Sequence, residues 1–430
     1  MIGEAELAIR DVKNHGIRDL RPVGAVREEN KFRFAFDEAA DQATRSTLIF
    51  SRVIHFMVSH DLIEIEWRQP ISKSRGGASP LATNAKRAYT GAVRVIWKKI
   101  RYRLEWLALK SAAKIVPLLS RNVCYRLAQI TGALAARLDR AGCRVALSNL
   151  QVAFGDELSP GRRNKIVRES YQHFARTMID LFWSPRLTSK NYSRYIDVVN
   201  LDLWQEELKP GNAVIFGCCH YSNFEWVAVA ASFFGVGSAL ITQEFKNALL
   251  DPIFVSLRES SGQRVIPRQG AVLRLYKTLR CGGRVAILTD LTTPAQLPTV
   301  AIDCFGLKTS VTFAHAWAHR RAGATVINVH CEPLPEGRYR IVFHPRVEFA
   351  PDASFQEIAQ ACWDQFEPFV RKNPAPWLWM YKHWRYRPVA ADPAVYPFYA
   401  NVSPEFERRL EESAKNLEPM SSTLTLEAVP

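Results

Sequence analysis

One short stretch of the sequence concentrates side chains that could do acid–base chemistry. It reads CCHYSNFEW over residues 218–226 and places His220 five positions before Glu225, directly after the apolar run AVIFG. The apolar run predicts a buried strand with His220 at or near its carboxyl end, where ligands bind in open α/β sheets. A histidine there, oriented by a carboxylate, is the general-base part of a triad whose nucleophile would be a substrate hydroxyl.

This chemistry places a condition on the local backbone. Five residues of ideal helix rotate by about 500°, which leaves Glu225 roughly 140° away from His220. The helix must therefore begin after His220, with Ser222 or Asn223 as its cap, so that the carboxylate can reach back to one imidazole nitrogen. The other nitrogen would then take a proton. The alternative is a structural histidine whose distance from a glutamate arises by chance.

The positive charge of the chain is concentrated in one segment. The 57 Lys and Arg exceed the 42 Asp and Glu by 15, and residues 68–138 alone hold fifteen basic residues and one acid, Glu105. Such a segment suits nucleic acid, an anionic membrane or an acidic protein. Trp97 and Trp106 alternate with Lys and Arg, which is typical of an interfacial amphipathic helix. The apolar part, residues 104–119, is shorter than the roughly 20 residues of a spanning helix. A solvated basic helix that covers the main domain is the alternative.

The pattern along the chain predicts an α/β fold, with a mixed, mostly parallel sheet flanked by helices. Strands are expected at residues 212–220, 238–244, 283–290, 324–334 and 338–349, and helices at 101–116, 122–142, 162–183, 223–234, 271–281, 310–323 and 355–373. We divide the chain into a small N-terminal module of unknown function (1–67), a basic flexible linker (68–91), a main domain (92–388) and a loose C-terminal tail (389–430). Within the main domain, residues 92–190 are helical and expected to bind a membrane, and residues 191–388 form the α/β core.

Several blocks in order resemble one enzyme family. HYSNFEW resembles the H-x-G-N-W-E element of the lipid A late acyltransferases, the lauroyl and myristoyl transferases of the glycerolipid acyltransferase superfamily with its H-x4-D/E motif. The further blocks are VALSNLQVAFGDELSP, FKNALLDPIFVSLRESSGQRVIPR, GGRVAILTD, AIDCFG, ATVINVHCEP and NPAPWLWMYKHWRYRP. The resemblance covers roughly residues 100–388. The chain departs from the family at four positions, namely Ser222, Phe224, Leu291 and Tyr381.

The resemblance implies an O-acyltransferase that moves a fatty acyl chain from an acyl carrier protein thioester to a hydroxyl of an anionic lipid A precursor. His220 would be the general base and Glu225 its orienting acid. Asn223, Arg258, Arg268 and Asp290 are candidate substrate-binding residues. Arg258 matches the family's arginine, which would contact a sugar phosphate, and Arg268 competes for that role. Either arginine could instead pair with a neighbouring acid. Asp290 ends a strand at the same sheet edge as His220 and could fix Arg258, bind a polar substrate group or cap a helix.

The expected location is the cytoplasmic face of the inner membrane, as a peripheral protein. The eight cysteines form no C-x-x-C pair, and the first residues lack the layout of a secretory signal, so a reducing compartment is favoured. No cofactor, metal or nucleic acid is expected. The alternatives are acylation of a lysophospholipid, an aminolipid or a phosphatidylinositol mannoside, or a catalytically silent membrane-binding scaffold.

Three other motifs carry weaker hypotheses. His315 and His319 have a spacing that can bind a metal on one helix face, but no third ligand is apparent. Cys218 and Cys219 adjoin the proposed base and could form an acyl-cysteine, although direct attack by a hydroxyl needs neither. The aromatic cluster near the end could stack on nucleic-acid bases, although packing or a lipid-facing edge fits its place after an α/β core better. Its members are Trp377, Trp379, Trp384, Lys382 and Arg385.

Overall fold

A seven-stranded sheet forms the centre of the molecule. The computed structural model describes residues 80–242, 245–267, 271–293 and 299–415. The expected module at 1–67 therefore lies outside the described residues. The strand order is β1-β9-β8-β2-β5-β3-β4, and every neighbouring pair is parallel except β8 and β9. The strands are β1 (Ile196–Val199), β2 (Val214–Cys218), β3 (Ala239–Thr242), β4 (Arg264–Pro267), β5 (Arg284–Leu288), β8 (Thr325–Pro333) and β9 (Tyr339–Phe343). The α/β prediction with a mixed, mostly parallel sheet is confirmed.

Helices cover both faces of this sheet, as the continuous apolar sequence of its central strand requires. Successive side chains of β2 point to opposite faces. Val214 and Phe216 enter the hydrophobic cluster that also holds Leu181 and Trp226, whereas Ile215 enters a second cluster with Leu275. The first face is covered by α6 (Pro160–Trp183), α7 (Phe224–Ala231) and α8 (Asp251–Glu259), and the second by α9 (Ala271–Arg280), α10 (Ala314–Ala322) and α11 (Phe355–Lys372).

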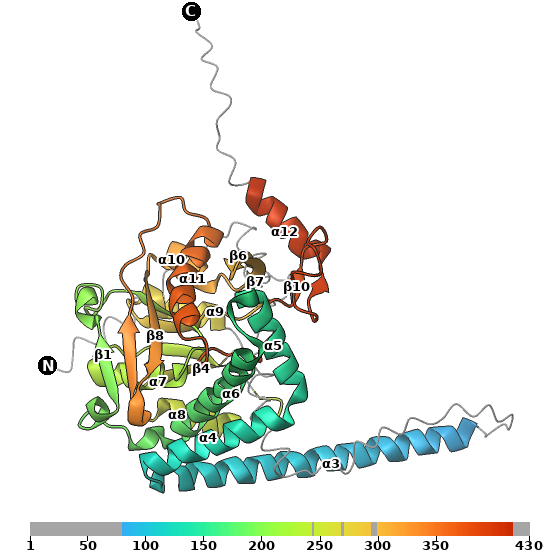
Figure 1. Ribbon diagram of the computed structural model, residues 1–430. Helices are drawn as coiled ribbons and strands as arrows, with labels where there is room; N and C mark the ends of the chain where they lie inside the picture. The colour runs from blue at the N-terminus through green and yellow to red at the C-terminus, as the bar shows by residue number, and fades with distance from the viewer. Residues whose placement is uncertain (1–79, 243–244, 268–270, 294–298, 416–430) are drawn as a thin grey trace, which may run out of the picture.

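Four helices in the described part of the chain precede the sheet. They are α3 (Pro80–Ile115), α4 (Arg121–Leu138), α5 (Arg140–Phe154) and α6. Figure 1 shows α3 as a long rod along one edge of the molecule, with its N-terminal half extending away from the body. Among the described residues, no helix combines the length and apolar character needed to cross a membrane.

The structure differs from the predicted elements in several places. The linker expected over 68–91 gives way to helix at Pro80, and the single helix expected over 122–142 is divided at Asp139. The Asp139 carboxylate accepts from Gly142 N at 2.9 Å and caps α5. The strands β1 and β4, the helix α8 and the hairpin of β6 (Val300–Cys304) and β7 (Leu307–Val311) were not predicted. All of these are short, so their sequence patterns are weak.

The C-terminal region is ordered well beyond the expected boundary at residue 388. The strand β10 (Tyr386–Arg387) pairs with β11 (Asn401–Val402), and α12 (Pro404–Lys415) follows. Phe406 of α12 is fully buried against Ala301 and Tyr386. Residues 389–415 are therefore not the loose tail that their Pro-, Ala- and Glu-rich composition suggested.

Candidate active site

The turn between β2 and α7 places His220 where the sequence predicted it. β2 ends at Cys218, and α7 begins at Phe224 with Asn223 as its N-cap. The Asn223 side-chain oxygen accepts a hydrogen bond from Trp226 N at 3.0 Å. The helix thus begins after the histidine, as the rotation argument required, and Glu225 falls in its first turn.

Ser222 holds the turn in a strained conformation. Its φ is +51°, in the left-handed region that favours glycine. Its backbone is fixed from both sides, because Ser222 N donates to Pro376 O at 2.9 Å and Thr177 Oγ1 donates to Ser222 O at 2.8 Å. The family's usual glycine at this position therefore has a conformational reason, and the serine tolerates the same backbone at a cost.

The partner of His220 is Asp290. The first residues after β2 and β5 meet at one sheet edge because these strands are parallel neighbours. Asp290 Oδ1 lies 2.7 Å from His220 Nδ1, and Asp290 Oδ2 accepts from His220 N at 2.9 Å. One carboxylate therefore holds both the ring and the backbone of the histidine.

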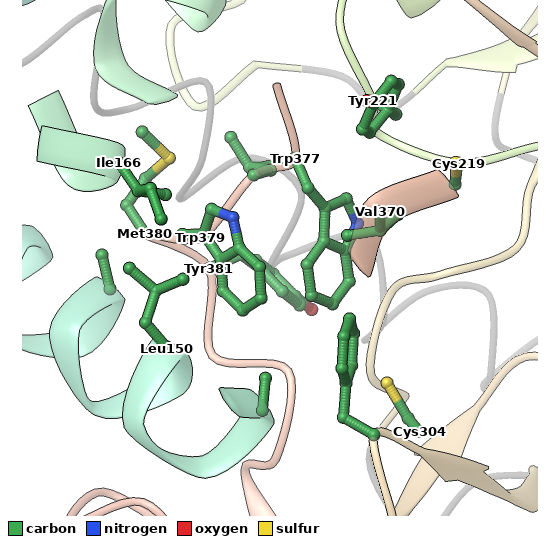
Figure 2. Packing of buried hydrophobic residues seen from close by; sticks show 14 of the residues in the cluster. Leu150, Ile166, Cys219, Tyr221, Cys304, Val370, Trp377, Trp379, Met380 and Tyr381 are labelled. Carbon is green, nitrogen blue, oxygen red and sulfur yellow. The ribbon is translucent and has the colours of Figure 1, made fainter. Parts of the chain in front are cut away.

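A third contact completes the surroundings of Asp290. Trp377 Nε1 donates to Asp290 Oδ2 at 3.0 Å. The His383 ring stacks on Trp377 with ring centroids 3.9 Å apart, and burial lowers the pKa of His383 to about 4. Figure 2 shows Trp377 and Trp379 next to each other in a buried cluster with Leu150 and Cys304. Trp377 thus shares the Oδ2 acceptor with the backbone of His220 and holds the carboxylate in place.

The protonation states follow from this arrangement. Burial by itself raises the pKa of Asp290, but the charge of His220 and its hydrogen bond outweigh burial and hold the pKa below the usual value. An ionised carboxylate only accepts hydrogen bonds, so Nδ1 carries the hydrogen, and in the neutral form of the ring the lone pair is on Nε2. Nε2 is therefore the nitrogen that could take a proton, and Asp290 would then stabilise the imidazolium.

Glu225 does not orient His220 and instead forms an ion pair with Arg258. Arg258 Nε and Nη2 donate to the two carboxylate oxygens at 3.0 and 2.6 Å. Arg258 lies in the last turn of α8 and Glu225 in the first turn of α7, so two helix ends are joined by a bidentate, largely buried pair. The expectation that Glu225 reaches back to the imidazole is corrected, because both of its oxygens are turned toward α8. Pairing with an acid was the alternative weighed for Arg258.

Asn223 is buried and has a structural role. Its amide nitrogen donates to Asp180 Oδ2 at 3.1 Å and its oxygen caps α7, and the residue has no exposed surface. Asp180 also accepts from Arg121 Nη1 at 2.5 Å and from Tyr339 Oη at 2.6 Å. The predicted substrate contact of Asn223 is therefore replaced by a buried network that joins α4, α6, β9 and the start of α7.

Three hypotheses from the sequence remain, which concern Arg268, the two cysteines and a metal site. Arg268 lies outside the described residues. Burial raises the pKa of both Cys218 and Cys219, which keeps these thiols protonated and disfavours an acyl-cysteine. His319 Nδ1 lies 2.7 Å from Ala324 O. Across the described part of the chain, no group of three or more His, Cys, Asp or Glu could hold a metal ion.

Two residues important to the site escaped the sequence reasoning. Trp377 appeared to be a packing residue, and its bond to Asp290 depends on tertiary contact over 87 positions. Asp180 carried a usable signal, because it is the lone acid in the apolar run MIDLFW. A carboxylate in a buried helix face needs partners, so its position indicated a polar network.

A known protein family matches most of the chain. The family model described as bacterial lipid A biosynthesis acyltransferase matches residues 96–386, which is well over half of the 430 residues. The resemblance stated from the motifs is thereby confirmed. No curated protein matches the chain.

Replacement of each acid by its amide should separate the roles of Asp290 and Glu225. We expect Asp290→Asn to lower kcat for acyl transfer by about 10²–10⁴, because the neutral amide no longer stabilises the imidazolium. Glu225→Gln should instead lower the free energy of unfolding by about 3 kcal/mol, since it leaves Arg258 buried without its counter-charge. Steady-state kinetics and denaturant unfolding of both variants measure the two effects. The His220→Ala variant gives the kcat that remains without the histidine. This assignment would be contradicted if Glu225→Gln folded normally but had that low kcat, while Asp290→Asn stayed active.

The strained turn yields a separate prediction. Replacement of Ser222 by glycine relieves a cost of roughly 1 kcal/mol for the left-handed conformation, partly offset by the greater freedom of glycine in the unfolded chain. We expect Ser222→Gly to unfold at the same or a slightly higher temperature and to retain activity. Ser222→Val should be strongly destabilised, because a branched side chain fits this φ poorly. A glycine variant that lost stability would show that the serine hydroxyl contributes a contact.

Proposed function

Since the chain belongs to the bacterial lipid A biosynthesis acyltransferase family, we propose that it transfers a fatty acyl group to a hydroxyl of a lipid A precursor, with His220 as general base. The observation that carries this proposal is the His220–Asp290 pair at the sheet edge. The pair lacks a nucleophile of its own, which suits a reaction in which the acceptor supplies the hydroxyl.

The proposed step follows from the positions of the protons. The acceptor oxygen attacks the carbonyl carbon of an acyl thioester while Nε2 of His220 takes the hydroxyl proton. The C–S bond then breaks, and the imidazolium returns the proton to the departing thiolate, which gives an ester and a free thiol. Such base assistance contributes about 10²–10⁴ in rate, and alignment of the two substrates adds to it.

We propose an acyl carrier protein thioester as the donor and an anionic glycolipid as the acceptor. Acyl carrier proteins are acidic, and the net charge of this chain is +15. Opposite charge steers association and makes it sensitive to salt. Arg258 has 16% of its side chain exposed beside its pair with Glu225, so an acceptor phosphate could approach the same guanidinium.

A two-helix apolar surface supports association with the membrane. We call two sets of exposed aliphatic side chains, one on α3 and one on α4, the platform. On α3 these are Ile96, Ile100, Leu104, Leu107 and Ile115, and on α4 they are Val123, Leu127, Ile130 and Leu134, each 36–66% exposed. The spacings of three, four or eight residues place each set on one helix face. Figure 1 shows both helices at the same edge of the molecule.

The charges around the platform suit an anionic surface. Eight exposed Lys and Arg lie between residues 96 and 138, and Glu105 is the sole acid there. Glu105 is turned inward, where its carboxylate accepts from Asn247 Nδ2 at 3.0 Å. Each basic residue near an anionic leaflet contributes roughly 1 kcal/mol. We therefore propose a peripheral position on the cytoplasmic face of the inner membrane, without a role for nucleic acid.

The function is tested by mass spectrometry of lipid extracts from cells with and without the protein. We expect the wild type, but not His220→Ala, to add one acyl chain to lipid A. An unchanged lipid A fraction beside an altered phospholipid or aminolipid fraction would support the alternative of another membrane lipid as acceptor. Unchanged lipids in every fraction, from a protein that still binds membranes, would support the silent scaffold.

The platform is tested by loss of two of its side chains. We expect Leu127→Ser/Ile130→Ser to weaken binding to vesicles of phosphatidylethanolamine and phosphatidylglycerol by about tenfold or more, since each half-exposed side chain contributes roughly 1 kcal/mol of burial. Leu203→Ser/Leu273→Ser is the matched control, because both leucines are about as exposed but lie outside α3 and α4. Sedimentation with vesicles measures the partition. Equal losses in both double variants would remove the platform from the proposal.

A further inference from the structure

The segment that follows the matched region folds back onto the elements that hold the site. The family match ends at residue 386, and residues 387–415 continue with β11 and α12. Asn401 N donates to Arg385 O at 2.8 Å and Ser403 N donates to Arg387 O at 3.0 Å. The segment is thus attached to the end of the loop that contains Trp377.

Asn149 of α5 is the junction between this segment and the loop. Its amide nitrogen donates to Trp379 O at 2.8 Å and to Tyr381 O at 2.7 Å, and its oxygen accepts from the Tyr399 hydroxyl. Tyr399 Oη also accepts from Trp384 N at 3.3 Å. Asn149 is fully buried and Tyr399 is 7% exposed, so these bonds act away from water, where geometry is tightly held.

The loop carries this restraint to Asp290 along two routes. The rings of Trp379 and Trp377 meet edge to face with centroids 4.7 Å apart, and the Trp377 indole donates to Asp290. Tyr381 Oη donates to Thr292 O at 3.2 Å, two residues after Asp290. The loop of residues 377–384 therefore contacts both the side chain of Asp290 and the backbone that follows Asp290. The same loop is hydrogen-bonded to Asn149 and Tyr399.

We infer that Tyr399, which lies beyond the family-matched region, is a positioning residue for the His220–Asp290 base and acts through Asn149 and the loop of residues 377–384. This inference rests on the proposed general-base function of His220. Tyr399 touches neither His220 nor Asp290 in the contacts described, so its effect passes through the orientation of the Asp290 carboxylate. A segment outside the matched region thereby contributes to the geometry of the reacting group.

The hydroxyl of Tyr399 can be removed with little change in shape. We expect Tyr399→Phe to lower kcat about tenfold with KM changed by less than about twofold, because small displacements of a catalytic group mainly affect the chemical step. Tyr396→Phe is the matched control. Tyr396 lies three residues away, is also 7% exposed, and donates its hydroxyl to Lys308 O instead.

Two measurements separate positioning from a general loss of stability. The first is a double-mutant cycle with Trp377→Phe, in which the loss of kcat in the double variant should be smaller than the product of the two single losses, since both changes act in part on one chain of contacts. Effects that multiply would overturn the inference, as would a Tyr399→Phe kcat equal to that of Tyr396→Phe.

The second measurement needs no substrate and therefore distinguishes failure of this inference from failure of the proposed function. The rate at which diethylpyrocarbonate modifies His220 is read by peptide mass spectrometry at one pH. We expect the rate to fall about threefold in Tyr399→Phe and to stay unchanged in Tyr396→Phe, because a less well-held carboxylate activates the ring less. Equal rates in all three proteins would overturn the inference, even if acyl transfer were absent.

Discussion

The site depends on one buried carboxylate that must be satisfied on every side. Asp290 has a fully buried side chain, and such a charge is tolerated only when donors surround it. Its donors are the backbone and ring of His220 and the indole of Trp377. This requirement fixes the tautomer of the histidine. It is met because β5 lies beside β2 and because the loop of residues 377–384 presents Trp377.

Other buried polar groups obey the same constraint and hold the frame of the site. Asp180 joins α4, α6, β9 and the cap of α7, and Asn149 joins α5 to the loop of residues 377–384 and to Tyr399. Each is almost inaccessible to water. An unpaired buried polar group would cost free energy, and hydrogen bonds are directional. These contacts therefore favour a single arrangement of the helices, which non-directional apolar packing alone would specify less tightly. The Glu225–Arg258 pair does the same for the ends of α7 and α8.

Much of the fold and part of the site were predictable from the sequence, for reasons that differ between residues. The apolar run of β2 and the Asn223 cap are local features, so the position of His220 at a strand end could be derived. The same reasoning placed Asp290 at the same edge. Short elements such as β1, β4 and the β6–β7 hairpin escaped prediction because four or five residues carry little periodicity. The C-terminal segment was misjudged because its composition resembles that of a linker, while its few aromatic side chains are buried.

The sequence by itself determined the family, the α/β class and the presence of a histidine at a strand end, because these depend on local pattern and on the order of motifs. Only the tertiary structure decided which acid pairs with that histidine. Glu225 is five residues from His220 and Asp290 is 70 residues away, yet the side chain of Glu225 is turned toward Arg258 while Asp290 meets the imidazole. The reason is geometric. The pairing of parallel strands brings Asp290 to the same sheet edge as His220, although the two are far apart in the sequence. The N-cap of α7 fixes the start of the helix that carries Glu225, and its side chain lies toward α8.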